Sequence, residues 1–136
     1  MDKNVLVVIP ARGGSKGIPR KNIRLMNGQP LISYVIKSAK QSKYVDKVVV
    51  STDDEEIAAI SARYGAEFIM RTGELAEDTI PLDPVIYDAV TRLEKENYTA
   101  DYVATIQPTS PLLSARTIDA VIEKMINNDC TYKKFS

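Results

Sequence analysis

The residues best suited to chemistry follow directly on an apolar run near the start of the chain. Val5 to Ile9 lacks the alternation of a half-exposed strand, so it predicts a strand buried on both faces, which we expect Pro10 to end. The segment after it carries three glycines and four cations, namely Gly13, Gly14, Gly17, Arg12, Lys16, Arg20 and Lys21. In an open α/β sheet, ligands bind outside the carboxyl ends of the strands, where this segment would lie.

This glycine-rich basic segment is suited to binding an anion. Gly13 and Gly14 would let the backbone come close to a ligand, so that amide N–H groups can point at phosphate oxygens. Arg12, Lys16 and Lys21 add full positive charges, and an arginine can hold a phosphate through two parallel hydrogen bonds. We therefore expect polyphosphate binding, against the simpler alternative of a solvated turn between two elements.

Two common phosphate-binding motifs do not match the segment. The ATPase loop requires Gly-Lys-Ser/Thr at its end, whereas Gly17 is followed by Ile18. The dinucleotide fingerprint requires Gly-x-Gly-x-x-Gly, and the glycines here have a different spacing. The segment therefore belongs to some other class of nucleotide or phosphate site.

Composition sets limits on the function. With 136 residues, 44% hydrophobic and 26% charged, residues 1–136 are expected to form a single α/β domain. The net charge is zero and the basic residues are local, which argues against nucleic acid as a partner. Cys130 is the only cysteine and histidine is absent, so an internal disulfide, a histidine triad and a His/Cys zinc site are excluded. No secretory or membrane-spanning segment is visible, and we expect a cytoplasmic protein.

Strand and helix patterns alternate along the chain. Strands are predicted at residues 5–9, 48–50, 67–70 and 102–106, with a further strand beginning near residue 130. Helices are expected from Pro30, after a turn at residues 26–30; after a cap at Thr52 or Asp53, with Gly65 as the stop; around residues 85–93; and after a cap at Ser114. This order predicts a parallel sheet, whose loops after the first, third and fourth of these strands converge on one crevice.

The other loops have simple structural explanations when they are considered alone. Arg71 and Glu74 could form a surface pair of little energetic value. Residues 107–112, QPTSPL, are typical of a rigid turn. Asp53 and Asp54 are expected to cap a helix rather than to bind a metal ion, and no metal ligand is assigned in this chain.

A family resemblance changes the interpretation of these loops. Residues 9–22, IPARGGSKGIPRKN, resemble the signature of the acylneuraminate cytidylyltransferases, the CMP-sialic acid synthetases and their relatives that act on other nonulosonic acids. The resemblance continues, in the family's order and at similar spacing, through residues 51–53 (STD), 71–79 (RTGELAEDT) and 107–112. It implies a mostly parallel sheet in a Rossmann-like three-layer αβα arrangement, of the nucleotide-diphospho-sugar transferase type.

The resemblance also implies a reaction and assigns residues to it. CMP would pass from CTP to the anomeric hydroxyl of a nonulosonic acid, with release of pyrophosphate and with Mg²⁺ as cofactor. Arg12 and Lys21 would stabilise charge on the reacting phosphates. Binding of the other phosphates would fall to the backbone of Gly13, Gly14 and Ser15 together with Lys16. Asn22 would hold the ribose and Arg71 the cytosine base. The acceptor sugar would contact Gln107, Thr109 and Ser110.

Members of this family are longer than this chain, so the resemblance implies the N-terminal nucleotide-binding part. Its Mg²⁺ ligands are expected in the C-terminal part that this sequence lacks, and a homodimer is possible. Ile80, Pro81 and Leu82 depart from the small hydroxyl residues of many sialic-acid-activating members, which leaves the acceptor sugar open. Two alternatives are a nucleotidyltransferase for another acidic sugar and a non-catalytic nucleotide-binding or assembly module.

Overall fold

The computed structural model describes residues 3–14, 21–71, 82–110 and 112–135. Within these residues a five-stranded sheet forms in the order β5-β4-β1-β6-β7, and every neighbouring pair is parallel. The strands are β1 (Val5–Ala11), β4 (Lys47–Thr52), β5 (Glu67–Met70), β6 (Tyr102–Ile106) and β7 (Tyr132–Phe135). The α-helices are α1 (Leu31–Gln41), α2 (Glu55–Arg63), α3 (Leu82–Lys95) and α4 (Ala115–Asn127).

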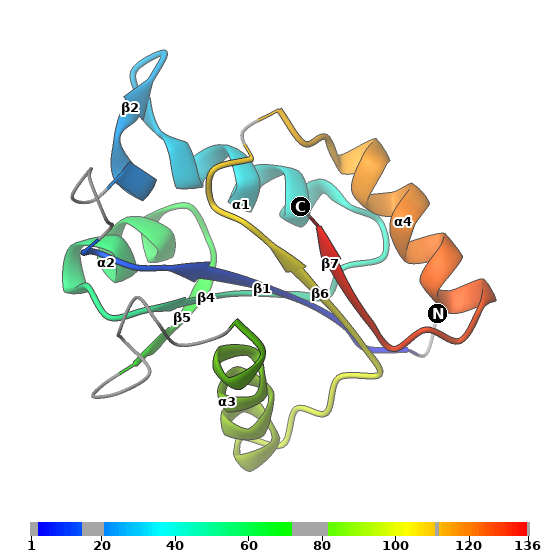
Figure 1. The fold of residues 1–136 in the computed structure, drawn as a ribbon. Helices are drawn as coiled ribbons and strands as arrows, with labels where there is room; N and C mark the ends of the chain where they lie inside the picture. Colours follow the sequence, from blue (N-terminus) through cyan, green and yellow to red (C-terminus); the bar gives the residue numbers. More distant parts are fainter. Residues whose placement is uncertain (1–2, 15–20, 72–81, 111, 136) are drawn as a thin grey trace.

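The helices lie on both faces of the sheet, which confirms the expected three-layer α/β arrangement (Figure 1). One core cluster joins residues of β1, β4 and β6 to α1, α2 and α4. The other cluster lies on the opposite face, where Leu6, Val8 and Val49 pack against Ile86 and Ala89 of α3. Because all seven residues of β1 are buried, the first strand is the centre of both clusters.

Two strands, β1 and β4, extend further than the sequence predicts, and β4 runs from Lys47 to Thr52. Pro10 does not end β1, which continues to Ala11 by pairing Pro10 with Ser51 and Ala11 with Thr52. Pairing with β6 stops at Val8, so Pro10 lies where β1 has only one neighbouring strand, a position where a missing N–H is tolerated. The prediction that the strand ends at Pro10 is therefore wrong.

The helix ends agree with the sequence in most places. Ser114 caps α4 as predicted, by accepting a hydrogen bond from Thr117 N–H, and Gly65 follows α2 with a φ of +94°. However, α2 is capped by Asp54, whose side chain accepts from the amides of Glu56 and Ile57, and not by Thr52 or Asp53. The α1 helix begins at Leu31, one residue later than expected.

A short hairpin links the first basic segment to α1. A 3-10 turn, η1 (Lys21–Ile23), is followed by β2 (Leu25–Met26) and β3 (Gln29–Pro30), which pair antiparallel. Asn27 and Gly28 connect them with φ values of +52° and +80°, as a two-residue hairpin turn requires. The predicted turn at residues 26–30 is thus confirmed, and it takes the form of a β-hairpin.

Burial of β1 gives a direct test of the core. Leu6→Ala should lower the free energy of unfolding by about 2 to 5 kcal/mol, because Leu6 is fully buried and its loss leaves a cavity. Leu25→Ala makes the same change at a side chain that is 67% exposed and should alter stability by less than about 0.5 kcal/mol. Urea unfolding of the two variants checks this, and equal losses would contradict the assignment of the core.

Candidate functional site

Parallel pairing brings the carboxyl ends of the strands to one edge of the sheet. The segment after β1 lies beside the β4–α2 turn at this edge, and the segment after β5 begins there with Arg71. The backbone N–H of Arg71 donates to Thr52 O at 2.7 Å, which joins the ends of β4 and β5. The edge therefore gathers three of the segments that the sequence singled out.

Gly13 is fixed by the turn between β4 and α2. Its N–H donates to Asp53 Oδ1 at 2.9 Å. A Cβ at Gly13 would lie 2.4 Å from Asp54 Oδ2 and 2.7 Å from Asp54 Cβ, distances that real Cβ atoms do not adopt. The next residue, Gly14, is exposed and has no such neighbour within 4 Å. Glycine is required at position 13 because the two turns touch, whereas Gly14 presents its backbone at the surface.

Asn22 holds the other end of the basic segment. Its side chain is 3% exposed, and its Nδ2 donates to Arg12 O at 2.9 Å. This hydrogen bond ties η1 back to the residue that follows β1. The predicted contact of Asn22 with a ribose stays a prediction.

Arg71 is a buried cation at the same edge. It is 4% exposed, and its Nη2 donates to Ser51 O at 3.2 Å. Burial lowers the pKa of Arg71 from its ordinary value, while the negative charge of Asp53 opposes that shift. The positive charge of Arg12 lowers the pKa of Arg71 further, and the negative charge of Asp88 opposes the shift as that of Asp53 does.

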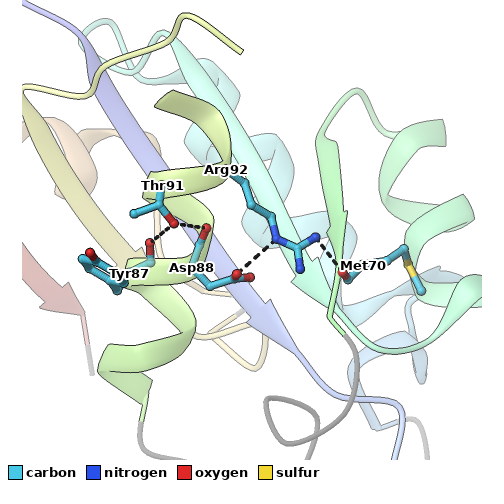
Figure 2. A network of polar contacts seen from close by, with 5 residues as sticks. All are labelled: Met70, Tyr87, Asp88, Thr91 and Arg92. Carbon is cyan, nitrogen blue, oxygen red and sulfur yellow. Dashed lines mark hydrogen bonds and ion pairs between the residues drawn. The ribbon is translucent and has the colours of Figure 1, made fainter. Parts of the chain in front are cut away.

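A polar network on α3 supports the residue before Arg71 (Figure 2). Arg92 Nε donates to Asp88 Oδ1 at 3.1 Å, and Arg92 Nη1 donates to Met70 O at 3.0 Å. The hydroxyl of Thr91 donates to the carbonyls of Tyr87 and Asp88 within the helix. These bonds attach α3 to the last residue of β5, and so fix the point from which Arg71 emerges.

The structure describes the other predicted site residues only in part. Ser15 and Lys16 lie outside the described residues, as does the side chain of Lys21, whose backbone begins η1. Gln107, Thr109 and Ser110 follow β6, which pairs parallel to β1, so they leave the sheet at the same edge. Thr109 is exposed, and Gln107 and Ser110 are half-buried. Their predicted role with an acceptor sugar stays a prediction.

The sequence analysis missed the role of Asp53. It grouped Asp53 with Asp54 as capping residues, but only Asp54 caps α2. The signal in the sequence was the occurrence of two adjacent aspartates. Only one of them can occupy the N-cap position, so the other carboxylate can accept a hydrogen bond from another donor.

Among the described residues, no group of three or more His, Cys, Asp or Glu side chains could hold a metal ion. An apolar hollow of about 370 Å³ lies elsewhere, between α3 and strands β6 and β7, where it is lined by Tyr87, Val90, Val103 and Tyr132 among others. No helix in the described ranges is both long enough and apolar enough to cross a bilayer.

Comparison with known proteins identifies the family of this chain. Residues 6–136 match the family model described as cytidylyltransferase. A pseudaminic acid cytidylyltransferase from Campylobacter jejuni is 41% identical over 128 residues, which are 93% of this chain and 55% of that protein. This chain belongs to the cytidylyltransferase family. The predicted resemblance is thereby confirmed.

Other relatives of this cytidylyltransferase chain act on different sugars by name. A CMP-N,N'-diacetyllegionaminic acid synthase from Legionella pneumophila is 40% identical, over 88% of this chain and 52% of that protein. An N-acylneuraminate cytidylyltransferase from Escherichia coli is 41% identical, over 89% of this chain and 28% of that protein. The chain thus spans about half the length, or less, of these curated relatives.

Solved structures share the fold of this cytidylyltransferase chain. A CMP:2-keto-3-deoxy-manno-octonic acid synthetase complexed with CTP has a TM-score of 0.79 at 24% identity, covering 94% of this chain and 49% of that one. A cytidylyltransferase from Leptospira borgpetersenii has a TM-score of 0.77 at 20% identity, covering 94% of this chain and 51% of that one. These similarities confirm the expected α/β nucleotidyltransferase fold.

The contact between Gly13 and Asp54 predicts a difference between two adjacent glycines. Gly13→Ala should destabilise the chain by about 1 to 3 kcal/mol, because the new methyl group would overlap Asp54 and push the two turns apart. Gly14→Ala adds the same group where nothing lies within 4 Å, and should change stability by less than about 0.5 kcal/mol. Thermal unfolding without ligand compares the two variants; a larger loss for Gly14→Ala would refute the geometry.

Proposed function

We propose that this chain supplies the CTP-binding part of an enzyme that transfers CMP from CTP to a nonulosonic acid, giving a CMP-sugar and pyrophosphate. The observation that carries the proposal is the carboxyl edge of the sheet, where Arg12 and the Gly13–Gly14 backbone follow β1, and the buried Arg71 follows β5. Family membership and the names of the relatives support cytidylyl transfer to a sialic-type acid.

The proposed binding of the triphosphate rests on backbone and charge. Gly14 presents its backbone at the surface directly after the fixed Gly13, so a phosphate can approach the amides without meeting a Cβ. We assign Arg12 and Lys21 to the charge that develops on the reacting phosphates, and Ser15 and Lys16 to binding of the outer phosphates. Stabilising that developing charge and orienting the phosphates are the main requirements of nucleotidyl transfer.

The proposed selection of cytosine rests on Arg71. A buried arginine can donate to both the carbonyl oxygen and N3 of cytosine, whereas N3 of uracil carries a hydrogen and would leave one donor without an acceptor in a poorly solvated site. The Arg71 guanidinium is already oriented by Ser51 O, so little further ordering is needed when a base binds.

The acceptor sugar is assigned to the loop after β6. Gln107, Thr109 and Ser110 leave the same sheet edge and are proposed to contact the acceptor, which we place among the nonulosonic acids without naming one. Mg²⁺ would neutralise phosphate charge in such a reaction. The described residues do not provide a ligand group for it, so no step is assigned to a metal here.

Selective stabilisation by CTP tests the nucleotide site. In the presence of Mg²⁺, CTP should raise the unfolding temperature of the chain by more than UTP, ATP or GTP does at equal concentration. A ligand at a hundred times its dissociation constant adds about 2.7 kcal/mol to the folded state. Equal shifts for all four nucleotides would argue against selection of cytosine, and release of pyrophosphate only with a nonulosonic acid would support the full reaction.

Removing a side chain that contacts phosphate should weaken the binding of CTP, whereas removing a cation elsewhere should not. Lys21→Ala is expected to raise the dissociation constant for CTP about tenfold, because a hydrogen bond to a charged group is worth about 1.5 to 3 kcal/mol. Lys95→Ala removes the same charge from an exposed position in the last turn of α3 and should leave CTP binding unchanged. Isothermal titration measures both; equal affinities for the two variants would remove Lys21 from the site.

A further inference from the structure

Asp53 lies between two parts of the proposed nucleotide site, the phosphate loop that contains Gly13 and the base-binding Arg71. It lies in the turn after β4, where Asp54 already caps α2, so Asp53 is not needed to begin that helix. Its Oδ1 accepts the N–H of Gly13 at 2.9 Å. The side chain therefore accepts a hydrogen bond from the first glycine of the phosphate loop, a residue 40 positions earlier in the sequence.

The charge of Asp53 also acts on Arg71. Burial disfavours the charged form of this arginine, and Asp53 is the strongest of the charges that oppose this effect. A carboxylate beside a phosphate-binding loop repels an incoming anion, so it is unfavourable for binding unless it does something else there. Arg71 lies beside the Asp53 turn, because its N–H donates to Thr52 O and its Nη2 donates to Ser51 O. Balancing this buried positive charge before a ligand arrives is such a role.

We propose that Asp53 is a positioning residue that couples the phosphate loop to the base-binding arginine, through its bond to Gly13 and its charge beside Arg71. The proposal rests on the proposed function and adds to it a residue that touches neither the triphosphate nor the base. Gly13 N–H donates to Asp53, so the first glycine of the loop is held by the turn after β4. Arg71 is buried, and the negative charge of Asp53 favours its charged form.

The chain contains a matched control at the opposite end of β1. Asp46 Oδ1 accepts the N–H of Val5 at 2.6 Å, just as Asp53 accepts the N–H of Gly13 after the other end of that strand. Asp46 also accepts from the hydroxyl of Tyr98 at 3.0 Å, so its removal should destabilise the fold at least as much. Asp46 lies at the amino edge of the sheet, far from the carboxyl ends of the strands.

Three variants separate the two roles of Asp53. Asp53→Ala removes both the acceptor for Gly13 and the charge beside Arg71. Asp53→Asn keeps an acceptor oxygen and removes only the charge. Asp46→Ala is the control for general destabilisation. Each is titrated with CTP and with inorganic tripolyphosphate, in the presence of Mg²⁺, and the Gly13 amide is followed by ¹⁵N NMR without ligand.

We expect a distinct result for each variant. Asp53→Ala should lose the protection of the Gly13 amide from exchange and bind both ligands about tenfold more weakly than the unaltered chain. Asp53→Asn should keep that protection and bind tripolyphosphate at least as tightly, but it should lose about tenfold in CTP affinity, because only CTP needs Arg71 in place. Asp46→Ala should bind both ligands with unchanged affinity, even if its unfolding temperature falls further.

The outcomes also distinguish this proposal from the proposed function. If the unaltered chain binds CTP and Asp53→Ala binds it as tightly as Asp46→Ala does, Asp53 is not a positioning residue, while the proposed function stands. Tripolyphosphate binding could depend on Asp53 while the unaltered chain shows no preference for CTP over UTP. In that case the role of Asp53 in positioning the phosphate loop stands, and the proposed selection of cytosine by Arg71 is wrong. If Asp53→Ala does not fold, Asp53→Asn decides alone: an undiminished CTP affinity in that variant overturns the coupling to Arg71.

Discussion

The parallel pairing of β1 with β4 on one side and β6 on the other is the constraint on which the rest of the structure depends. Every residue of β1 is buried, so this strand can lie only in the middle of the sheet, with helices on both faces. Parallel pairing then fixes the direction of its neighbours and places their carboxyl ends at one edge. The basic segment after β1, the turn after β4 and Arg71 after β5 meet for that reason and not because any of them attracts the others.

Once these segments meet, the site is determined by contacts between turns. The lack of a side chain at Gly13 allows the segment after β1 to pack against Asp54, and the N–H of Gly13 is taken by Asp53. Arg71 is buried beside the same turn, and α3 supports it through the bond from Arg92 to Met70 O (Figure 2). Arg12 and Arg71 thus bring positive charge to the same edge as the Asp53 carboxylate, which accepts the N–H of Gly13.

Much of this arrangement can be predicted from the sequence, because the alternation of strands and helices and the burial of β1 follow from hydrophobic patterns. The third and fourth predicted strands have the observed bounds, and the cap at Ser114 and the turn at residues 26–30 are found as expected. The errors occur where a neighbouring segment decides the outcome. Pro10 stays in β1 because β4 alone pairs with it, and the choice between Asp53 and Asp54 as the cap depends on the position of Gly13. The residue pattern of one segment contains no information about such contacts between segments.

The measurement that tests the central claim most directly is a crystal structure of the chain with CTP. We predict that the triphosphate lies against the backbone of Gly13 and Gly14 and that the cytosine ring lies on the side of Arg71, at the carboxyl edge of β1, β4 and β5. A nucleotide found instead in the apolar hollow between α3 and β7, or anywhere at the amino edge of the sheet, would contradict the account.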